Sequence, residues 1–190
     1  MHYTGTIWRP PYEASSLLLE ATAGCTHHRC KFCTLYADLP FPFRMSRLSD
    51  MEEDLKEAEE LYHHRMGRRM SRVFLTGANP FVLKYEKLMK IAERIRAYFP
   101  EVKTIGSFAR VTDITGKTDE ELAALGRAGY DGLTIGMETA DETALAFMDK
   151  GYRASDILEQ CSRLDGAGIH YSFFYLAGIS GAGCAEAGAK

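Results

Sequence analysis

Two patterns of apolar and polar positions alternate along this chain, one typical of strands and the other of helices. Five short apolar stretches, each bounded by turn-forming residues, have the length and composition of strands. Between them, apolar residues recur every three or four positions, as in amphipathic helices. The predicted strands are Ser16–Thr22, Arg72–Thr76, Val102–Ser107, Gly132–Gly136 and His170–Gly178.

The helical segments carry their own start and stop signals. Ser49 with Glu52, and Thr118 with Glu121, are spaced as capping boxes at helix N-termini. Gly129 marks the expected end of the helix that Thr118 begins. Shorter helices are expected over Glu142–Met148 and Ser155–Leu164. The apolar stripes are Leu48, Met51, Leu55, Ala58 and Leu61 in one helix, Leu88, Ile91, Ala92 and Ile95 in the next, and Leu122 and Leu125 in the third.

The regular order of strand and helix predicts an α/β fold with a parallel sheet. The sheet is either doubly wound or a whole or partial barrel, and functional loops then lie at the C-terminal ends of its strands. We expect one core domain over residues 1–190, with an N-terminal extension (1–15), a βα core (16–181) and a tail (182–190). Because no closing strand follows the fifth, we expect a fragment truncated before its last strand.

Composition narrows the class of protein. The net charge is −3, so no general basic character points to nucleic acid. The basic residues His63, His64, Arg65, Arg68, Arg69 and Arg72 are interpreted as a solvated helix end, and the alternative is a contact with tRNA or another anionic substrate. No signal peptide is recognisable and no apolar run approaches a membrane span, so a cytoplasmic protein without membrane contact is expected.

Three of the five cysteines fall in one short segment, as Cys25, Cys30 and Cys33. An odd number of clustered cysteines argues against a disulfide framework and for a metal site. Three thiolates on one loop can ligate three irons of a 4Fe–4S cluster, and the fourth iron then stays open to a ligand. Cys161 is interpreted as a buried apolar thiol, and Cys184 receives no role.

Zinc is the competing metal. The same three cysteines with His27 or His28 would form a Cys3His site. Structural zinc modules usually combine two separated ligand clusters, and no second cluster is present in the sequence. The loop also follows the first predicted strand, where active sites gather. We therefore favour iron–sulfur and interpret the two histidines as solvated.

With these cysteines, the sequence resembles the radical S-adenosylmethionine (radical SAM) superfamily, whose usual signature is C-x3-C-x2-C with an aromatic before the last cysteine. Phe32 matches that aromatic, which in the family packs near the adenine. Here the spacing is C-x4-C-x2-C, one residue longer. The run from Arg9 to Ala14, together with the long loop, is similar to a poorly characterised branch of the family. The resemblance implies a partial parallel (β/α) barrel, a 4Fe–4S cluster and S-adenosylmethionine (SAM).

The resemblance also assigns cofactor contacts at later strand ends. Gly77, Ala78 and Asn79 occupy the place of the family's Gly-Gly-Glu motif, whose carbonyls hold the methionyl amino group. The second glycine and the glutamate are absent, and the alternative is an ordinary strand-to-helix turn. Glu138 corresponds to a residue that contacts the ribose. Lys150 corresponds to a cation that meets the methionyl carboxylate, and its alternative is a solvated lysine.

Three further contacts are expected from the family. Ser107 lies where relatives place a polar ribose contact, Arg110 could meet the carboxylate instead of Lys150, and Ala177 lies in the segment against adenine.

The implied reaction is reductive cleavage of SAM to a 5′-deoxyadenosyl radical that abstracts hydrogen from an unknown substrate. It requires an external one-electron donor, such as a flavodoxin or ferredoxin. No catalytic residue beyond the cluster ligands is identified. The alternatives are a non-catalytic iron–sulfur or zinc-binding α/β protein and an ordinary barrel enzyme with incidental cysteines.

Overall fold

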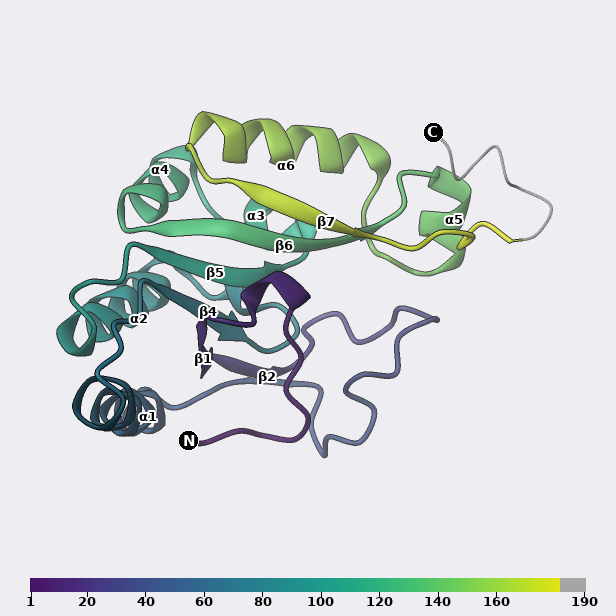
Figure 1. Ribbon diagram of the computed structural model, residues 1–190. Coiled ribbons are helices and arrows are strands. Elements are labelled where there is room, and N and C mark those ends of the chain that lie inside the picture. Colours follow the sequence, from purple (N-terminus) through teal and green to yellow (C-terminus); the bar gives the residue numbers. More distant parts are fainter. Residues whose placement is uncertain (182–190) are drawn as a thin grey trace.

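The computed structural model describes residues 1–181 and has a curved sheet of five parallel strands at its centre (Figure 1). The strand order β1-β4-β5-β6-β7 follows the chain, because each crossover returns to the next position in the sheet. The predicted α/β fold with a partial parallel barrel is confirmed. The strands are β1 (Leu17–Glu20), β4 (Arg72–Thr76), β5 (Thr104–Ala109), β6 (Tyr130–Glu138) and β7 (Tyr171–Tyr175).

Helices cover the outer face of this sheet, with α1, α2, α4 and α6 following one another around it (Figure 1). No helix of the described part is both long and apolar enough to cross a membrane. The helices are α1 (Leu48–Glu59), α2 (Tyr85–Tyr98), α3 (Val111–Thr115), α4 (Asp119–Arg127), α5 (Glu142–Phe147) and α6 (Ala154–Gly166), with a π-helical turn η2 (Glu60–Arg65) and 3-10 turns η1 (Pro11–Glu13) and η3 (Pro80–Val82).

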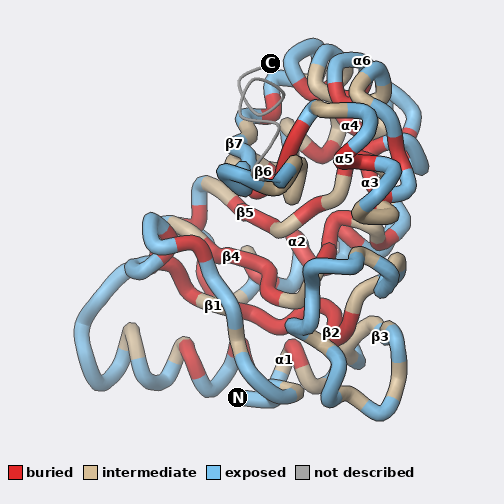
Figure 2. The backbone as a smooth tube through the Cα atoms, turned by 90° about the vertical axis from the view of Figure 1, so that its right-hand side faces the viewer, coloured by how far each residue is buried: buried red, intermediate tan, exposed pale blue. Residues whose placement is uncertain are grey.

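The core lies between the strands and the inner helix faces, where the buried positions in Figure 2 are concentrated. Leu55 of α1, Ile91 of α2 and Leu125 of α4 are at most 1% exposed. They pack against strand residues such as Val73 and Ile105, which are fully buried. Each buried side chain of this size contributes about 2 kcal/mol to the free energy of unfolding. The apolar spacing seen in the sequence thus identifies the face that each helix buries.

Several local predictions are corrected. The first predicted strand is divided into β1 and a short strand β2 (Thr22–Gly24), which pairs antiparallel with β3 (Phe43–Met45). The Ser49–Glu52 capping box is wrong, because α1 begins at Leu48 and the Ser49 hydroxyl donates to Asp50 instead. The box of Thr118 and Glu121 is confirmed, with both of its hydrogen bonds formed.

Three other expectations meet mixed outcomes. Leu61 falls in the π-helical turn η2 and is exposed, so the apolar stripe of α1 ends before it. Cys161 is half-buried in α6 and packs against the core. Cys184 lies outside the described residues.

A buried ion pair crosses the concave side of the sheet. Glu13, which is 1% exposed, accepts two hydrogen bonds from Arg72 Nε (2.9 and 3.1 Å) and one from its Nη2 (2.6 Å). Arg72 Nη1 also donates to Thr104 Oγ1 (2.9 Å). The guanidinium fills the space above Gly106, where a Cβ would lie 2.5 Å from Nη2. Arg72 therefore does not belong to the solvated basic face that the sequence predicted.

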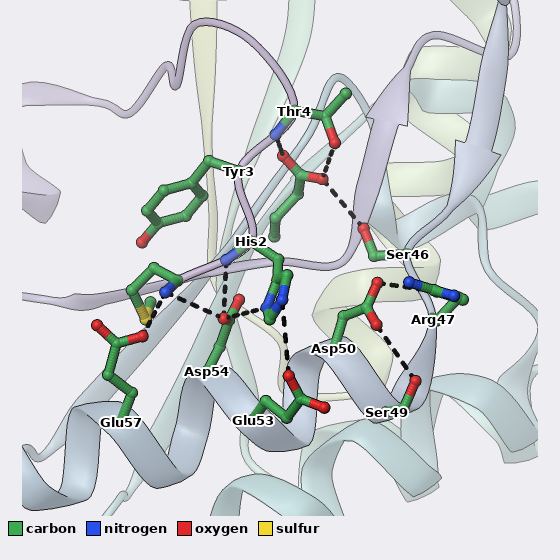
Figure 3. Close-up of polar contacts among 12 residues, drawn as sticks. His2, Tyr3, Thr4, Ser46, Arg47, Ser49, Asp50, Glu53, Asp54 and Glu57 are labelled. Atoms are coloured by element: carbon green, nitrogen blue, oxygen red, sulfur yellow. Dashed lines mark hydrogen bonds and ion pairs between the residues drawn. The ribbon is translucent and has the colours of Figure 1, made fainter.

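The N-terminal extension is fastened to the sheet and to α1. His2 N donates to Asp54 (2.8 Å), and Thr4 donates to the buried Glu20 through its N–H (2.6 Å) and its hydroxyl (2.9 Å) (Figure 3). Further along, Tyr12 Oη is 2.8 Å from Thr134 Oγ1 of β6. The extension therefore runs from the β1 edge across to β6.

Helix α3 follows β5 directly and was missed in the sequence because it spans little more than one turn. Its Asp113 is buried and accepts hydrogen bonds from Arg110 N (2.8 Å) and Asn79 Nδ2 (3.1 Å). Lys117 Nζ donates to the carbonyls of Phe81 (2.6 Å) and Asp113 (3.0 Å). This polar network joins the C-terminal ends of β4 and β5.

We expect Glu13→Gln to lower the free energy of unfolding by about 2–3 kcal/mol, because the partly buried guanidinium of Arg72 loses its counter-charge. Urea unfolding followed by circular dichroism measures this change. The matched control is Glu53→Gln. The Glu53 side chain is 70% exposed, so this substitution should lower the free energy of unfolding by less than about 0.5 kcal/mol. Equal effects of the two substitutions would contradict the structural role of Glu13.

Asp113 gives a pH-dependent prediction. Burial raises its pKa to about 6, although hydrogen bonds from Arg110 N and Asn79 oppose the shift. The carboxyl therefore binds its proton more tightly in the folded chain than in the unfolded chain. The resulting stabilisation is fully present below the unfolded pKa of 3.8 and is lost as the pH rises through about 6.

We therefore expect the unfolding free energy of the wild type, relative to Asp113→Asn, to fall between about pH 4 and pH 6 and then to stay level. Urea titrations of both proteins across this range provide the measurement. A difference that grows with pH would show that Asp113 is more acidic in the folded chain, contrary to its burial.

Candidate functional site

The loop between β2 and β3 carries the three cysteines and is closed at its base. Cys25 N donates to the carbonyl of Pro42 (2.8 Å), beside the β2–β3 pairing. Gly24 has a φ of +77°, as expected for a sharp turn after the first strand. Figure 1 shows the loop beyond the C-terminal ends of the strands, on the side where α5 lies.

Residues from the turn after β4 and from the segment after α5 hold this loop. Asn79, fully buried after β4, donates to Thr26 Oγ1 (2.8 Å) and to Asp113. On the other side, His27 Nε2 donates to the carbonyl of Asp149, and Lys31 N donates to that of Met148 (3.1 Å). His27 is therefore not the solvated loop residue that the sequence predicted. Its bond joins the cysteine loop to the segment that contains Lys150.

A cavity of about 260 Å³ connects the cysteines with residues from later strand ends. Its wall draws on the cysteine loop, the turn after β4, the ends of β5 and β6, β7 and the segment after α5. The predicted site residues on this wall are Cys25, Cys30, Cys33, Phe32, Ala78, Arg110, Glu138 and Lys150. Residues far apart in the sequence thus face one space.

Four predicted residues lie off this wall, and their roles stay predictions. Gly77 lies against Thr22 of β2, and Asn79 is engaged in the bonds to Thr26 and Asp113. The hydroxyl of buried Ser107 donates to the carbonyl of Phe108 (2.9 Å). Ala177 is exposed in the turn after β7.

Glu138 and Lys150 form an ion pair inside the cavity wall, with 3.6 Å between Oε1 and Nζ. Lys150 Nζ also donates to the carbonyl of Gly136 (2.8 Å) and lies 5.4 Å from the centre of the Phe32 ring. Burial raises the pKa of Glu138 and lowers that of Lys150, while the attraction between them opposes both shifts. The two charges therefore depend on each other for stabilisation in a poorly hydrated place.

Arg110 braces this pair. Its Nη2 donates to the carbonyl of Lys150 and its Nη1 to Thr112 Oγ1 (3.2 Å). Burial raises the pKa of the Cys30 thiol, and the positive charges of Lys150 and Arg110 act in the opposite direction. The wall opposite the cysteines is therefore cationic, which favours thiolates and other anions.

Backbone strain is concentrated around the same cavity. Among the described residues, His28, Glu138 and Asp149 are the non-glycine residues with positive φ, at 49°, 68° and 52°. Side chains rarely adopt this region, and it is often occupied where a functional group must be aimed. Glu138 also lies at an irregularity in the β6–β7 pairing. The surrounding contacts hold these residues in an unfavourable conformation next to the cysteines.

The donor set fits an iron–sulfur cluster. Across residues 1–181, no three His, Cys, Asp or Glu side chains are arranged to hold a single metal ion. In a 4Fe–4S cluster each cysteine would ligate a different iron. Three thiols on one loop, all facing a shared cavity with a cationic wall, match that requirement.

Several solved structures share the fold of this chain at low sequence identity. They include the cobalamin-dependent S-adenosylmethionine radical enzyme OxsB (18% identity, TM-score 0.69), methylornithine synthase PylB (15%, 0.58) and coproporphyrinogen III oxidase HemN from Escherichia coli (16%, 0.55). The matches cover 85%, 86% and 83% of this chain but 24%, 45% and 36% of those proteins. The chain thus spans less than half the length of each.

No protein in the curated collection matches the sequence. The family model of the radical SAM superfamily matches residues 19–181, which include the cysteine loop and every strand from β4 to β7. Together with the shared fold, this match shows that the chain belongs to the radical SAM superfamily.

Proposed function

We propose that this chain is the core of a radical SAM enzyme in which Cys25, Cys30 and Cys33 hold a 4Fe–4S cluster. When bound, the cluster supplies the electron that cleaves SAM to methionine and a 5′-deoxyadenosyl radical, which abstracts hydrogen from a substrate. The observation that supports this proposal best is the shared cavity. It brings the three cysteines together with Glu138 and Lys150.

The wall residues have the chemistry that SAM requires. The Lys150 ammonium is suited to the methionyl carboxylate, and the Glu138 carboxylate to the ribose hydroxyls. Without the cofactor these two groups neutralise each other at 3.6 Å. Binding would give Lys150 a new counter-charge and Glu138 two hydroxyl donors when the pair opens. Phe32 provides a flat apolar surface for adenine, and the backbone around Gly77, Ala78 and Asn79 provides acceptors for the methionyl amino group.

The proposed reaction needs one electron from outside the chain, for which a flavodoxin or ferredoxin of the cytoplasm is suited. Ser107, Arg110 and Ala177 remain proposed as further SAM contacts. Of these three, Arg110 lies on the cavity wall.

Anaerobic reconstitution with iron and sulfide tests the cluster. The wild type is expected to develop broad absorption at about 400 nm, and Cys30→Ala to lose it because one ligand is missing. Cys161→Ala is the matched control, since this thiol lies in α6 away from the cavity, and should leave the absorption unchanged.

Reduction of the reconstituted protein in the presence of SAM should then release 5′-deoxyadenosine, measured by liquid chromatography. A colourless protein that purifies with one zinc would overturn the proposal and favour a zinc-binding role for the loop. A coloured protein with no bound SAM would favour the non-catalytic iron–sulfur protein.

A further inference from the structure

The N-terminal extension supplies two residues to the cavity wall that no expectation from the sequence assigned to it. Trp8 and Arg9 line the cavity together with Phe108 and Phe174. They precede the turn η1, which lies in front of the sheet in Figure 1. The cavity therefore has a side that is built from neither the cysteine loop nor the SAM-contacting residues proposed above.

The residues that follow Trp8 and Arg9 hold the backbone of this side of the cavity in place. Pro10 is buried and Pro11 begins η1, so the backbone has little freedom there. Glu13 is bound to Arg72, and Tyr12 Oη is 2.8 Å from both Thr134 Oγ1 and Ser172 Oγ. The backbone that follows Trp8 and Arg9 is thus fixed before any ligand binds, which reduces the entropy lost on binding.

The charges on the wall distinguish Arg9 from the other two cations. Lys150 is paired with Glu138, and Arg110 donates to the Lys150 carbonyl and to Thr112. Arg9 has five N–H groups, and within the described residues its guanidinium makes one hydrogen bond, to the carbonyl of Ala14 (3.2 Å). It has no acidic partner in that part of the chain. Arg9 also lines a second hollow, which it shares with Ala14, so its side chain lies between the two, and its remaining donors are available to an anion.

The surface around Arg9 is apolar and partly open. Trp8 and Phe174 are 45% and 40% exposed although both are large and apolar. The rings of Phe174 and Phe108 lie 6.1 Å apart between their centres, with a tilt of 36°. Partly exposed aromatic side chains gathered around a cavity are typical of a ligand site.

We propose that Trp8 and Arg9 form the substrate subsite beside the SAM-binding part of the cavity, and that the substrate is a flat apolar molecule carrying one compact anionic group. Its anion binds the Arg9 guanidinium and its apolar body packs on Trp8 and Phe174. This assignment rests on the proposed radical SAM function. The subsite itself is built entirely from protein side chains.

Calorimetric titration with three probes of the same shape tests the subsite: 2-naphthoate, 2-naphthyl phosphate and the neutral 2-naphthamide. The protein is the cluster-loaded chain with SAM present, so that the cofactor part of the cavity is filled. Arg9→Gln is expected to weaken binding of the preferred anionic probe about tenfold and to change 2-naphthamide binding less than about twofold. Arg9→Lys should restore part of the loss.

The matched control is Arg69→Gln, which removes the same charge from an exposed position outside this cavity and should change neither affinity. Trp8 is the one tryptophan of the chain, so a change in its fluorescence on probe binding reports the location. A preference of the wild type for 2-naphthoate or for 2-naphthyl phosphate identifies the anion. Either preference supports the proposal if it is lost in Arg9→Gln. Equal weakening of the charged and neutral probes, or equal binding of both by the wild type, would overturn it.

The same titration on the chain without cluster separates this inference from the proposed function. The naphthalene probes should still bind through Arg9, because no cluster atom is needed. If no cluster forms but the Arg9 effect persists, the anion site stands and the radical function falls. If the cluster forms and cleaves SAM but the Arg9 effect is absent, the proposed function stands and this subsite falls.

Discussion

Parallel pairing of β1, β4, β5, β6 and β7 is the constraint on which the rest of the molecule depends. After each strand the chain must return to the starting end of the sheet before the next strand begins. All strands therefore finish at the same end of the sheet. The cysteine loop and the segments that carry Ala78, Arg110, Glu138 and Lys150 lie at that end. Residues more than a hundred positions apart meet there because the parallel strands are hydrogen-bonded side by side.

Two ion pairs of different geometry lie at the two ends of the strands. Near the strand starts, the buried Glu13 and the partly buried Arg72 form a hydrogen-bonded ion pair that fixes the N-terminal extension. Near the strand ends, Glu138 and Lys150 form a longer ion pair beside the cysteines. The first pair makes most of its hydrogen bonds to the protein, whereas we propose that the second exchanges partners when a cofactor binds. This difference in geometry is consistent with a structural role for the first pair and with the cofactor role proposed for the second.

The sequence predicted the sheet, the helices and the cysteine loop well, because long periodic segments and clustered cysteines are strong local signals. It missed α3 and β3, which are too short to show a period. It placed Arg72 on a solvated face, since nothing in the local pattern reveals a partner 59 positions away in Glu13. The bond from His27 to the Asp149 carbonyl was hidden for the same reason. Tertiary contacts of this kind carry no signature in neighbouring residues.

The central claim is that the cavity holds SAM on an open iron next to Lys150. Pulsed electron–nuclear double resonance on the reduced, cluster-loaded chain with SAM labelled with nitrogen-15 in its amino group tests it most directly. The account predicts a nitrogen coupling to the cluster in the wild type and weaker SAM binding, by about tenfold, in Lys150→Met. SAM that binds without any such coupling, or that binds Lys150→Met with unchanged affinity, would contradict it.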